Sequence, residues 1–209
     1  MSFFTWFFLC ILGSAVNYLL ITTLVDWLLM GIAVPHFSKN HFPQSFSVTQ
    51  KNRIDFQQNL ECSAFSSAYI LRHFGLDANG KELYQIMPNK MKSGYVYPKG
   101  ICNLLNRYGL YTKYRIGNLN ALKKEVSKGN PVIVLIRIEK SSKALHYVPV
   151  VGYNEKEIYL AESLEYLSNC EEKHYNRKIA IQEFKMLWNT SMLKMPLYRN
   201  TYIAVEKKT

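Results

Sequence analysis

The chain lacks the patterns typical of metal-binding, disulfide-stabilised and nucleotide-binding proteins. Its four cysteines, Cys10, Cys62, Cys102 and Cys170, are widely separated, and none of them forms a CxxC pair. No spacing of Cys and His is typical of a zinc site, and no GxxxxGK[ST] loop is present that would hold nucleotide phosphates. Internal repeats and low-complexity tracts are also absent. We therefore expect an ordinary folded domain without a metal or an organic cofactor.

Blocks of Lys and Arg are also missing, although the chain is basic. It contains 26 Lys and Arg against 15 Asp and Glu, for a formal net charge of +11. Such a charge can indicate nucleic-acid binding, but here the basic residues are scattered and no nucleic-acid motif accompanies them. We therefore expect no nucleic-acid partner. A basic domain held near anionic lipid explains the charge more simply.

Charge is absent from residues 3–25, which form one long apolar run. A membrane-spanning helix needs about 20 such residues, whereas a secretory signal has a basic start and an apolar core of about 7–15 residues. The sequence thus predicts a retained, single-pass transmembrane anchor within residues 1–35, with Asp26 near the interface. An uncleaved or atypically cleaved signal is the alternative. The side of the membrane stays open, because the positive-inside rule favours a cytoplasmic domain but long domains are translocated regardless of charge.

The remaining sequence predicts a connector over residues 36–53 and one domain over residues 54–209. The connector is polar and has no apolar period. In the domain, small residues followed by a stop at Gly75 indicate a helix over residues 62–75. Further helices are predicted over residues 81–87, 99–108 and 119–127.

The second half of the domain has the pattern of strands. Residues 131–138 are a β-branched run. Residues 146–153 and 158–163 flank a polar turn and should form a hairpin, with a bulge or unpaired edge at Pro149. A strand leading into a helix over 179–188 and a last strand over 202–205 complete the set. Helices followed by an antiparallel sheet indicate an α+β fold.

Cys62 is the one cysteine whose surroundings in the sequence suggest chemistry. A cysteine nucleophile reacts as the thiolate, which a helix N-terminus and a neighbouring imidazolium both stabilise. Cys62 begins the predicted helix over residues 62–75, and the small residues that follow leave room for a substrate carbonyl. Cys102 and Cys170 are more simply explained as small buried residues.

Three other residues supply what thiol chemistry requires. The amide of Gln57, or of its neighbour Gln58, can turn toward a developing oxyanion beside the backbone N–H of Cys62. His146 opens a strand and can serve as the base, and Glu162 at the end of the paired strand can orient its imidazole. Each of these residues alone is more often structural. Their combination in this order points to a catalytic site.

Three blocks carry a family resemblance. They are QQNLECSAFSSAYILRHFG at residues 57–75, LKKEVSKGNPVIVLIRI at residues 122–138 and HYVPVVGYNEKEIYLAES at residues 146–163. Over residues 54–205 the chain resembles the papain-like peptidases that process double-glycine leaders of bacteriocins. The resemblance implies a papain-like cysteine peptidase fold, with Cys62 as nucleophile, His146 as base, Glu162 as orienting group and Gln57 in the oxyanion hole.

The resemblance also implies a peptide or protein substrate and an export transporter, which would here be a separate chain. Three departures matter. The spacing to Cys62 is a little short from Gln57 and shorter from Gln58. Ser63 follows Cys62 where the family usually has Gly, and Glu162-Ser163 stands where the family has Asp-Pro. A Glu is one methylene longer than an Asp, so its hold on His146 can differ. These departures leave a second hypothesis, a catalytically silent papain-like module that binds a peptide or a membrane partner.

Overall fold

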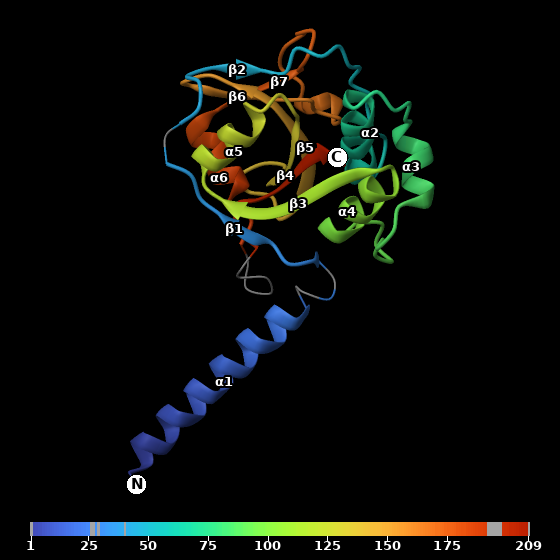
Figure 1. The fold of residues 1–209 in the computed structure, drawn as a ribbon. Helices are drawn as coiled ribbons and strands as arrows, with labels where there is room; N and C mark the ends of the chain where they lie inside the picture. Colours follow the sequence, from blue (N-terminus) through green and yellow to red (C-terminus); the bar gives the residue numbers. More distant parts are fainter. Residues whose placement is uncertain (1, 26–27, 29, 40, 192–197, 209) are drawn as a thin grey trace.

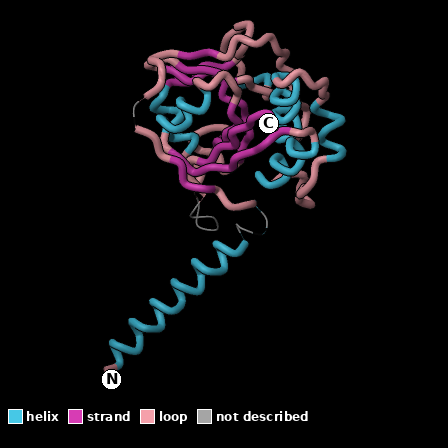
Figure 2. Tube along the Cα trace, viewed as in Figure 1, coloured by secondary structure: helices cyan, strands magenta, loops and turns pink. Residues whose placement is uncertain are grey.

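A single long helix projects from the globular part of the chain. The structure is a computed structural model and describes residues 2–25, 28, 30–39, 41–191 and 198–208. Helix α1 spans Phe3–Val25 and extends away from the other elements (Figures 1 and 2). Its apolar side chains are mostly exposed, and the helix is long and apolar enough to cross a membrane. The predicted apolar helix is therefore present, whereas Asp26 lies outside the described residues.

The four helices predicted before the sheet are all present. They are α2 (Cys62–His73), α3 (Gly80–Ile86), α4 (Pro98–Arg107) and α5 (Leu119–Val126), and α6 (Ile181–Trp188) follows later in the chain. Gly75 adopts a φ of +85°, the left-handed conformation that glycine tolerates best, just after α2 ends. The side chain of Asn79 accepts hydrogen bonds from the first N–H groups of α3, which fixes its start.

One eight-stranded sheet lies between the helices (Figure 2). Its strands are β1 (Val34–His36), β2 (Phe46–Ser47), β3 (Leu110–Gly117), β4 (Val132–Arg137), β5 (Leu145–Tyr153), β6 (Glu157–Leu160), β7 (Arg177–Ala180) and β8 (Thr201–Lys207). The main order is β1-β3-β8-β4-β5-β6-β7, and β2 pairs with β5. All pairs are antiparallel except β1 with β3. The hairpin of β5 and β6 confirms the prediction, and its register shifts between Val150 and Gly152, close to Pro149.

Alternation along β4 divides the core between the two faces of the sheet. Ile133 and Leu135 belong to the cluster that includes α2, α3 and α4, whereas Val134 and Ile136 belong to the cluster that includes α5 and α6. Successive side chains of a strand point to opposite faces, so one β-branched run supplies both cores. Figure 1 shows α2, α3 and α4 on one side of the sheet and α5 and α6 on the other.

Two segments differ from the simple plan of helices followed by a sheet. Residues 110–117 form β3, a long strand between α4 and α5, where no element was expected. The expected connector over residues 36–53 contributes β2, and its Phe42 and Phe46 pack against the core. This polar-looking segment therefore runs along the sheet. The domain limits themselves stay a prediction.

Candidate active site

Cys62 is the first residue of α2 and lies where that helix packs against β5. The following residues are small, and Ser63, Ala64, Ser66 and Ser67 are almost completely buried. The Oγ of Ser66 donates a hydrogen bond of 3.0 Å to the carbonyl of Tyr147 in β5. Small side chains thus let the helix approach the strand closely, and this contact places Cys62 next to the start of β5.

His146, the second residue of β5, contacts Glu162 directly and lies near Cys62. Its Nε2 lies 2.7 Å from Oε1 of Glu162. The imidazole also interacts with the side chain of Cys62, and both residues line the same cavity. Because Nε2 is used by Glu162, Nδ1 is the ring nitrogen left for the thiol. The structure therefore brings together the three residues predicted as nucleophile, base and orienting group.

The surroundings of His146 favour its protonated form. The ring is completely buried, and burial alone would lower the pKa because it disfavours charge. The charge of Glu162, the hydrogen bond to Glu162 and the interaction with Cys62 act in the opposite direction, and together they raise the pKa of His146 from 6.5 to about 9. An imidazolium next to Cys62 is the partner that a thiolate requires.

Glu162 is completely buried and every part of its carboxylate has a partner. Oε1 accepts a second hydrogen bond from the backbone N–H of Leu164, at 2.8 Å, and Oε2 accepts one from Nη1 of Arg177, also at 2.8 Å. Burial would raise the pKa of Glu162, but His146, the N–H of Leu164 and Arg177 lower it below its usual value. The carboxylate is thus held ionised where it contacts His146.

Sequence reasoning missed two residues of this network, Arg177 and Asn176. The side chain of Asn176 accepts a hydrogen bond from the N–H of Glu162 and donates one to its carbonyl, at 2.7 and 2.9 Å. Arg177 is the first residue of β7 and pairs with Leu160 of β6, and Asn176 directly precedes the strand. Only the pairing of β6 with β7 places them beside Glu162, and no local sequence signal indicates this pairing.

The two candidate oxyanion donors have different surroundings. Gln57 is half-buried; its Nε2 donates to the carbonyl of Asn59 at 2.6 Å, and its Oε1 accepts from Oγ of Ser163 at 2.7 Å. Gln58 is exposed, and its Oε1 lies 3.5 Å from Nζ of Lys81. The geometry therefore favours Gln57, whose side chain is fixed, over Gln58.

A cavity of about 330 Å³ adjoins these residues. Cys62, His146, Gln57 and Gln58 all line it. Most of its other wall is apolar or aromatic and consists of Leu60, Tyr95, Ile138, Leu145, Leu164 and Tyr166. The arrangement offers a thiol, a base and amide donors to one bound molecule. Across the described part of the chain, no group of three or more His, Cys, Asp or Glu residues is placed to hold a metal ion.

One family model matches most of the chain. Residues 32–192 match the model of the Peptidase_C39 like family. The chain belongs to this family. No curated protein matches it in sequence. The match begins well before the expected domain start at residue 54, and it includes the segment that forms β1 and β2.

Solved structures show that the fold is that of papain-like peptidases. The peptidase domain of Streptococcus ComA, a bifunctional ABC transporter involved in quorum sensing, is 12% identical, with a TM-score of 0.56 over 76% of this chain and 100% of that domain. A double-glycine-motif protease from an AMS/PCAT transporter, solved with its leader peptide, is 17% identical, with a TM-score of 0.51 over 78% and 98%. A cysteine protease from Carica candamarcensis is 14% identical, with a TM-score of 0.55 over 80% and 100%. The predicted fold class is therefore confirmed.

Proposed function

We propose that the protein is a thiol-dependent peptide-bond hydrolase, a cysteine peptidase. The observation that carries this proposal is the buried chain of contacts from Cys62 through His146 to Glu162, at a helix N-terminus and beside an apolar cavity. The family supports it, since cysteine peptidases share this fold. Fold alone does not determine activity, so the proposal depends on the site.

In the first half of the reaction, the thiolate of Cys62 attacks the carbonyl carbon of a peptide bond and forms a C–S bond. The carbonyl π electrons move to the oxygen, and the backbone N–H of Cys62 and the amide of Gln57 stabilise the resulting oxyanion. The tetrahedral intermediate collapses, the C–N bond breaks, and the imidazolium of His146 gives its proton to the leaving amine. A thioester on Cys62 remains, and His146 is neutral.

In the second half, water replaces the amine. His146 takes a proton from the water as the water oxygen attacks the thioester carbonyl. Collapse of this second intermediate breaks the C–S bond, releases a carboxylic acid and returns the thiolate–imidazolium pair. Glu162 does not exchange protons; it holds the ring orientation and stabilises the imidazolium.

The substrate we propose is a peptide or a protein segment with an extended backbone. The apolar and aromatic wall of the cavity suits an apolar side chain of such a segment. Two structural neighbours are peptidase domains of transporters, and one was solved with a leader peptide. Leader processing in concert with a separate export transporter is therefore the specific form of this proposal.

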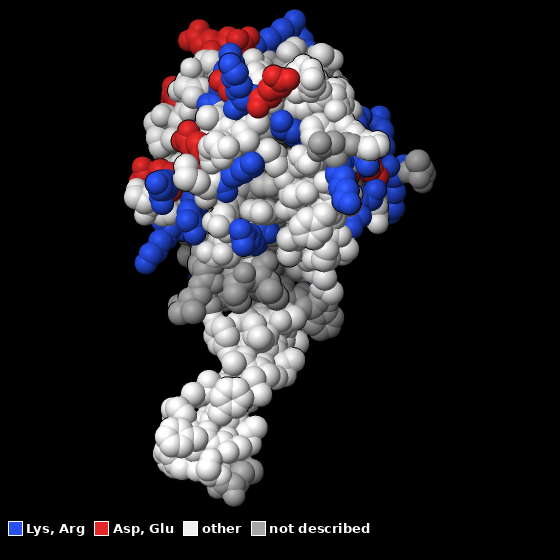
Figure 3. Space-filling view, turned by 90° about the vertical axis from the view of Figure 1, so that its left-hand side faces the viewer, with Lys and Arg blue, Asp and Glu red and all other residues white. Residues whose placement is uncertain are grey.

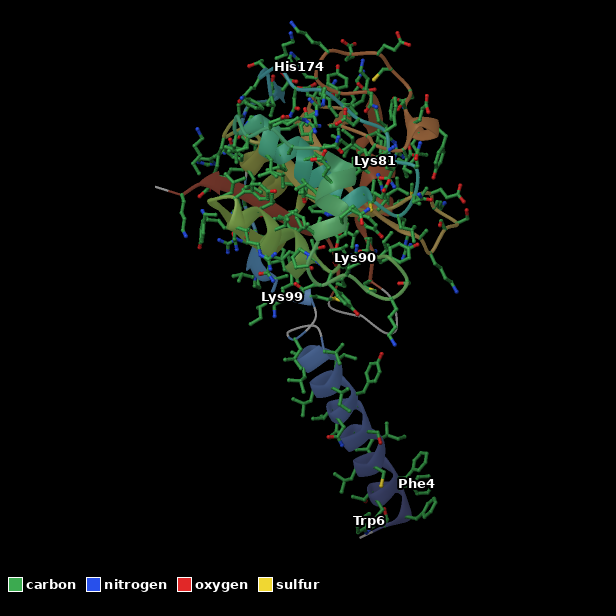
Figure 4. All side chains as sticks on the ribbon, turned by 90° about the vertical axis from the view of Figure 1, so that its right-hand side faces the viewer. Phe4, Trp6, Lys81, Lys90, Lys99 and His174 are labelled. Atoms are coloured by element: carbon green, nitrogen blue, oxygen red, sulfur yellow. The ribbon has the colours of Figure 1, made fainter. Side chains whose placement is uncertain are left out.

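We also propose that α1 anchors the peptidase in a membrane. At about 1.5 Å per residue, a helix of 23 residues is roughly 35 Å long, enough for the hydrocarbon core. In the face drawn in Figure 3, the charged side chains nearest to α1 are Lys and Arg. Figure 4 shows Lys99 at the base of the domain, close to α1, while Phe4 and Trp6 extend from its far end. A surface rich in Lys and Arg at this end of the domain suits an anionic membrane.

The test uses the purified full chain in detergent micelles and a panel of fluorogenic peptide amides. Cys62→Ala and His146→Ala should each remove nearly all hydrolysis, and the double variant should be little worse than either, because residues that act as one unit are non-additive. In parallel, iodoacetamide should alkylate Cys62 much faster than the other cysteines, and His146→Ala should slow that reaction. Unreactive Cys62 and no hydrolysis of any amide would instead favour the silent binding module.

A further inference from the structure

Two hydrogen bonds join the segment before Cys62 to the residue after Glu162. The backbone N–H of Gln57 donates to the carbonyl of Ser163 at 2.9 Å. The Oγ of Ser163 lies 2.7 Å from Oε1 of Gln57. Ser163 is only 6% exposed, so this contact is largely shielded from water. Gln57 is thus held to Ser163 by both its backbone and its side chain.

The neighbours of Gln57 determine which way its amide faces. Its Nε2 lies 2.6 Å from the carbonyl of Asn59, which can only accept a hydrogen bond. The atom facing Ser163 must therefore be Oε1, and the hydroxyl of Ser163 must be the donor. One N–H of Nε2 is used by Asn59, which leaves the second N–H free to donate. Gln57 lines the same cavity as Cys62 and His146.

We infer that Ser163 is a positioning residue that orients the amide of Gln57 toward the oxyanion formed at Cys62. This inference rests on the proposed peptidase function. An amide that flips would present its oxygen instead of its N–H to the developing negative charge. The carbonyl of Asn59, which can only accept, opposes that flip, and the hydroxyl of Ser163 holds the amide in this orientation by donating to Oε1. Preorganised donors stabilise a transition state because they need no rearrangement during the reaction.

The inference gives a role to a residue that departs from the family pattern. Glu162 contacts His146, and the next residue, Ser163, contacts Gln57. Consecutive residues just beyond the end of β6 thus hold the base and the oxyanion donor. A proline side chain, which the family has at this position, carries no donor and would leave Oε1 of Gln57 without this partner.

The experiment separates two steps that use the same thiol. Hydrolysis of the fluorogenic amide that the wild type cleaves best passes through an oxyanion, whereas alkylation by iodoacetamide depends on the thiolate alone. Ser163→Ala removes the hydroxyl and Ser163→Thr keeps it. Ser127→Ala is the matched control, because its hydroxyl bonds the carbonyl of Lys124 on α5. Thermal unfolding of each variant reports whether it is folded.

In Ser163→Ala, kcat should fall roughly tenfold with little change in KM, less than the roughly 10²–10³-fold loss expected when a donor itself is removed. The alkylation rate should stay within about twofold of wild type, Ser163→Thr should recover most of kcat, and Gln57→Ala should lose no further activity when Ser163→Ala is added. Unchanged kcat in Ser163→Ala, or alkylation that falls in parallel with kcat, would overturn the inference while leaving the peptidase intact. A wild-type chain that cleaves no amide would overturn the proposed function and the inference with it.

Discussion

The guanidinium of Arg177 and the carboxylate of Glu162 form an ion pair of 2.8 Å in the interior of the protein. Glu162 is completely buried and Arg177 is 6% exposed. The other carboxylate oxygen contacts His146 at 2.7 Å, so Glu162 bridges two cationic groups. A buried carboxylate is costly unless it is paired. We conclude that Arg177 lets Glu162 remain ionised without depending on His146 alone.

Arg177→Gln should therefore reduce both stability and activity. A buried charge that loses its partner costs roughly 3 kcal/mol or more, which thermal and urea unfolding will detect. Glu162 will then bind a proton more easily, so alkylation of Cys62 should slow. Arg177→Lys should recover only part of the loss, because an ammonium does not reproduce the guanidinium geometry. Lys178→Gln serves as the control, because it removes a positive charge from the half-buried residue that follows Arg177 in the chain. Wild-type stability in Arg177→Gln would show that the pair is dispensable.

Substitutions of Glu162 test whether its carboxylate orients His146 or is only structural. Glu162→Gln keeps the shape but removes the charge that favours the imidazolium, so peptide hydrolysis should fall roughly 10²-fold, less than in Cys62→Ala. Glu162→Asp should also lose activity, because the shorter side chain cannot reach His146, Arg177 and the N–H of Leu164 from the same backbone position. Steady-state kinetics of both variants measure this. If Asp matched the native residue, the extra methylene would merely be tolerated.

The pH dependence follows from the raised pKa of His146. Since that pKa rises from 6.5 to about 9, the imidazolium should persist, and hydrolysis should continue, until the pH passes about 9. The stability of the fold should depend on pH in the same direction as the activity. The contribution of protonated His146 to stability is complete below about pH 6.5 and lost as the pH rises through about 9. In Glu162→Gln the alkaline limb of the activity profile should move to lower pH. Profiles of kcat/KM for the two proteins test this, and coincident alkaline limbs would contradict it.

The helices and the central hairpin could be predicted because their signals are local. Gly75, Gly109 and Gly129 each adopt a positive φ just after a predicted helix, where the sequence placed the stop. The strand over residues 131–138 was recognisable from its β-branched run, because it is buried on both faces. Local signals of this kind also allowed the positions of Cys62 and His146 near the starts of their elements to be inferred.

The missed parts depend on long-range pairing. Strand β3 has a half-buried pattern with Lys113 and Arg115 among its residues, so it lacks a continuous apolar run, and its pairing with β8 stabilises it. β1 is only three residues long and exists through its contact with β3. The role of Arg177 depends on β7 lying beside β6. Tertiary contacts of this kind override local propensity.

The last prediction concerns α1 and where the soluble domain begins. Residues 34–36 pair with β3, and Nδ1 of His36 lies 2.5 Å from the hydroxyl of Tyr202. Met30 is 6% exposed and belongs to the core cluster. A chain beginning at Met30 should thus keep every strand and be soluble, folded and reactive at Cys62. A matched chain beginning at Lys39 loses β1 and should unfold at a lower temperature.

The full chain should pellet with membranes and resist high salt and carbonate, because α1 exposes its apolar side chains. Recovery of the intact full chain in the soluble fraction would refute anchoring, and N-terminal sequencing of the membrane-bound protein would reveal removal of α1 as a signal.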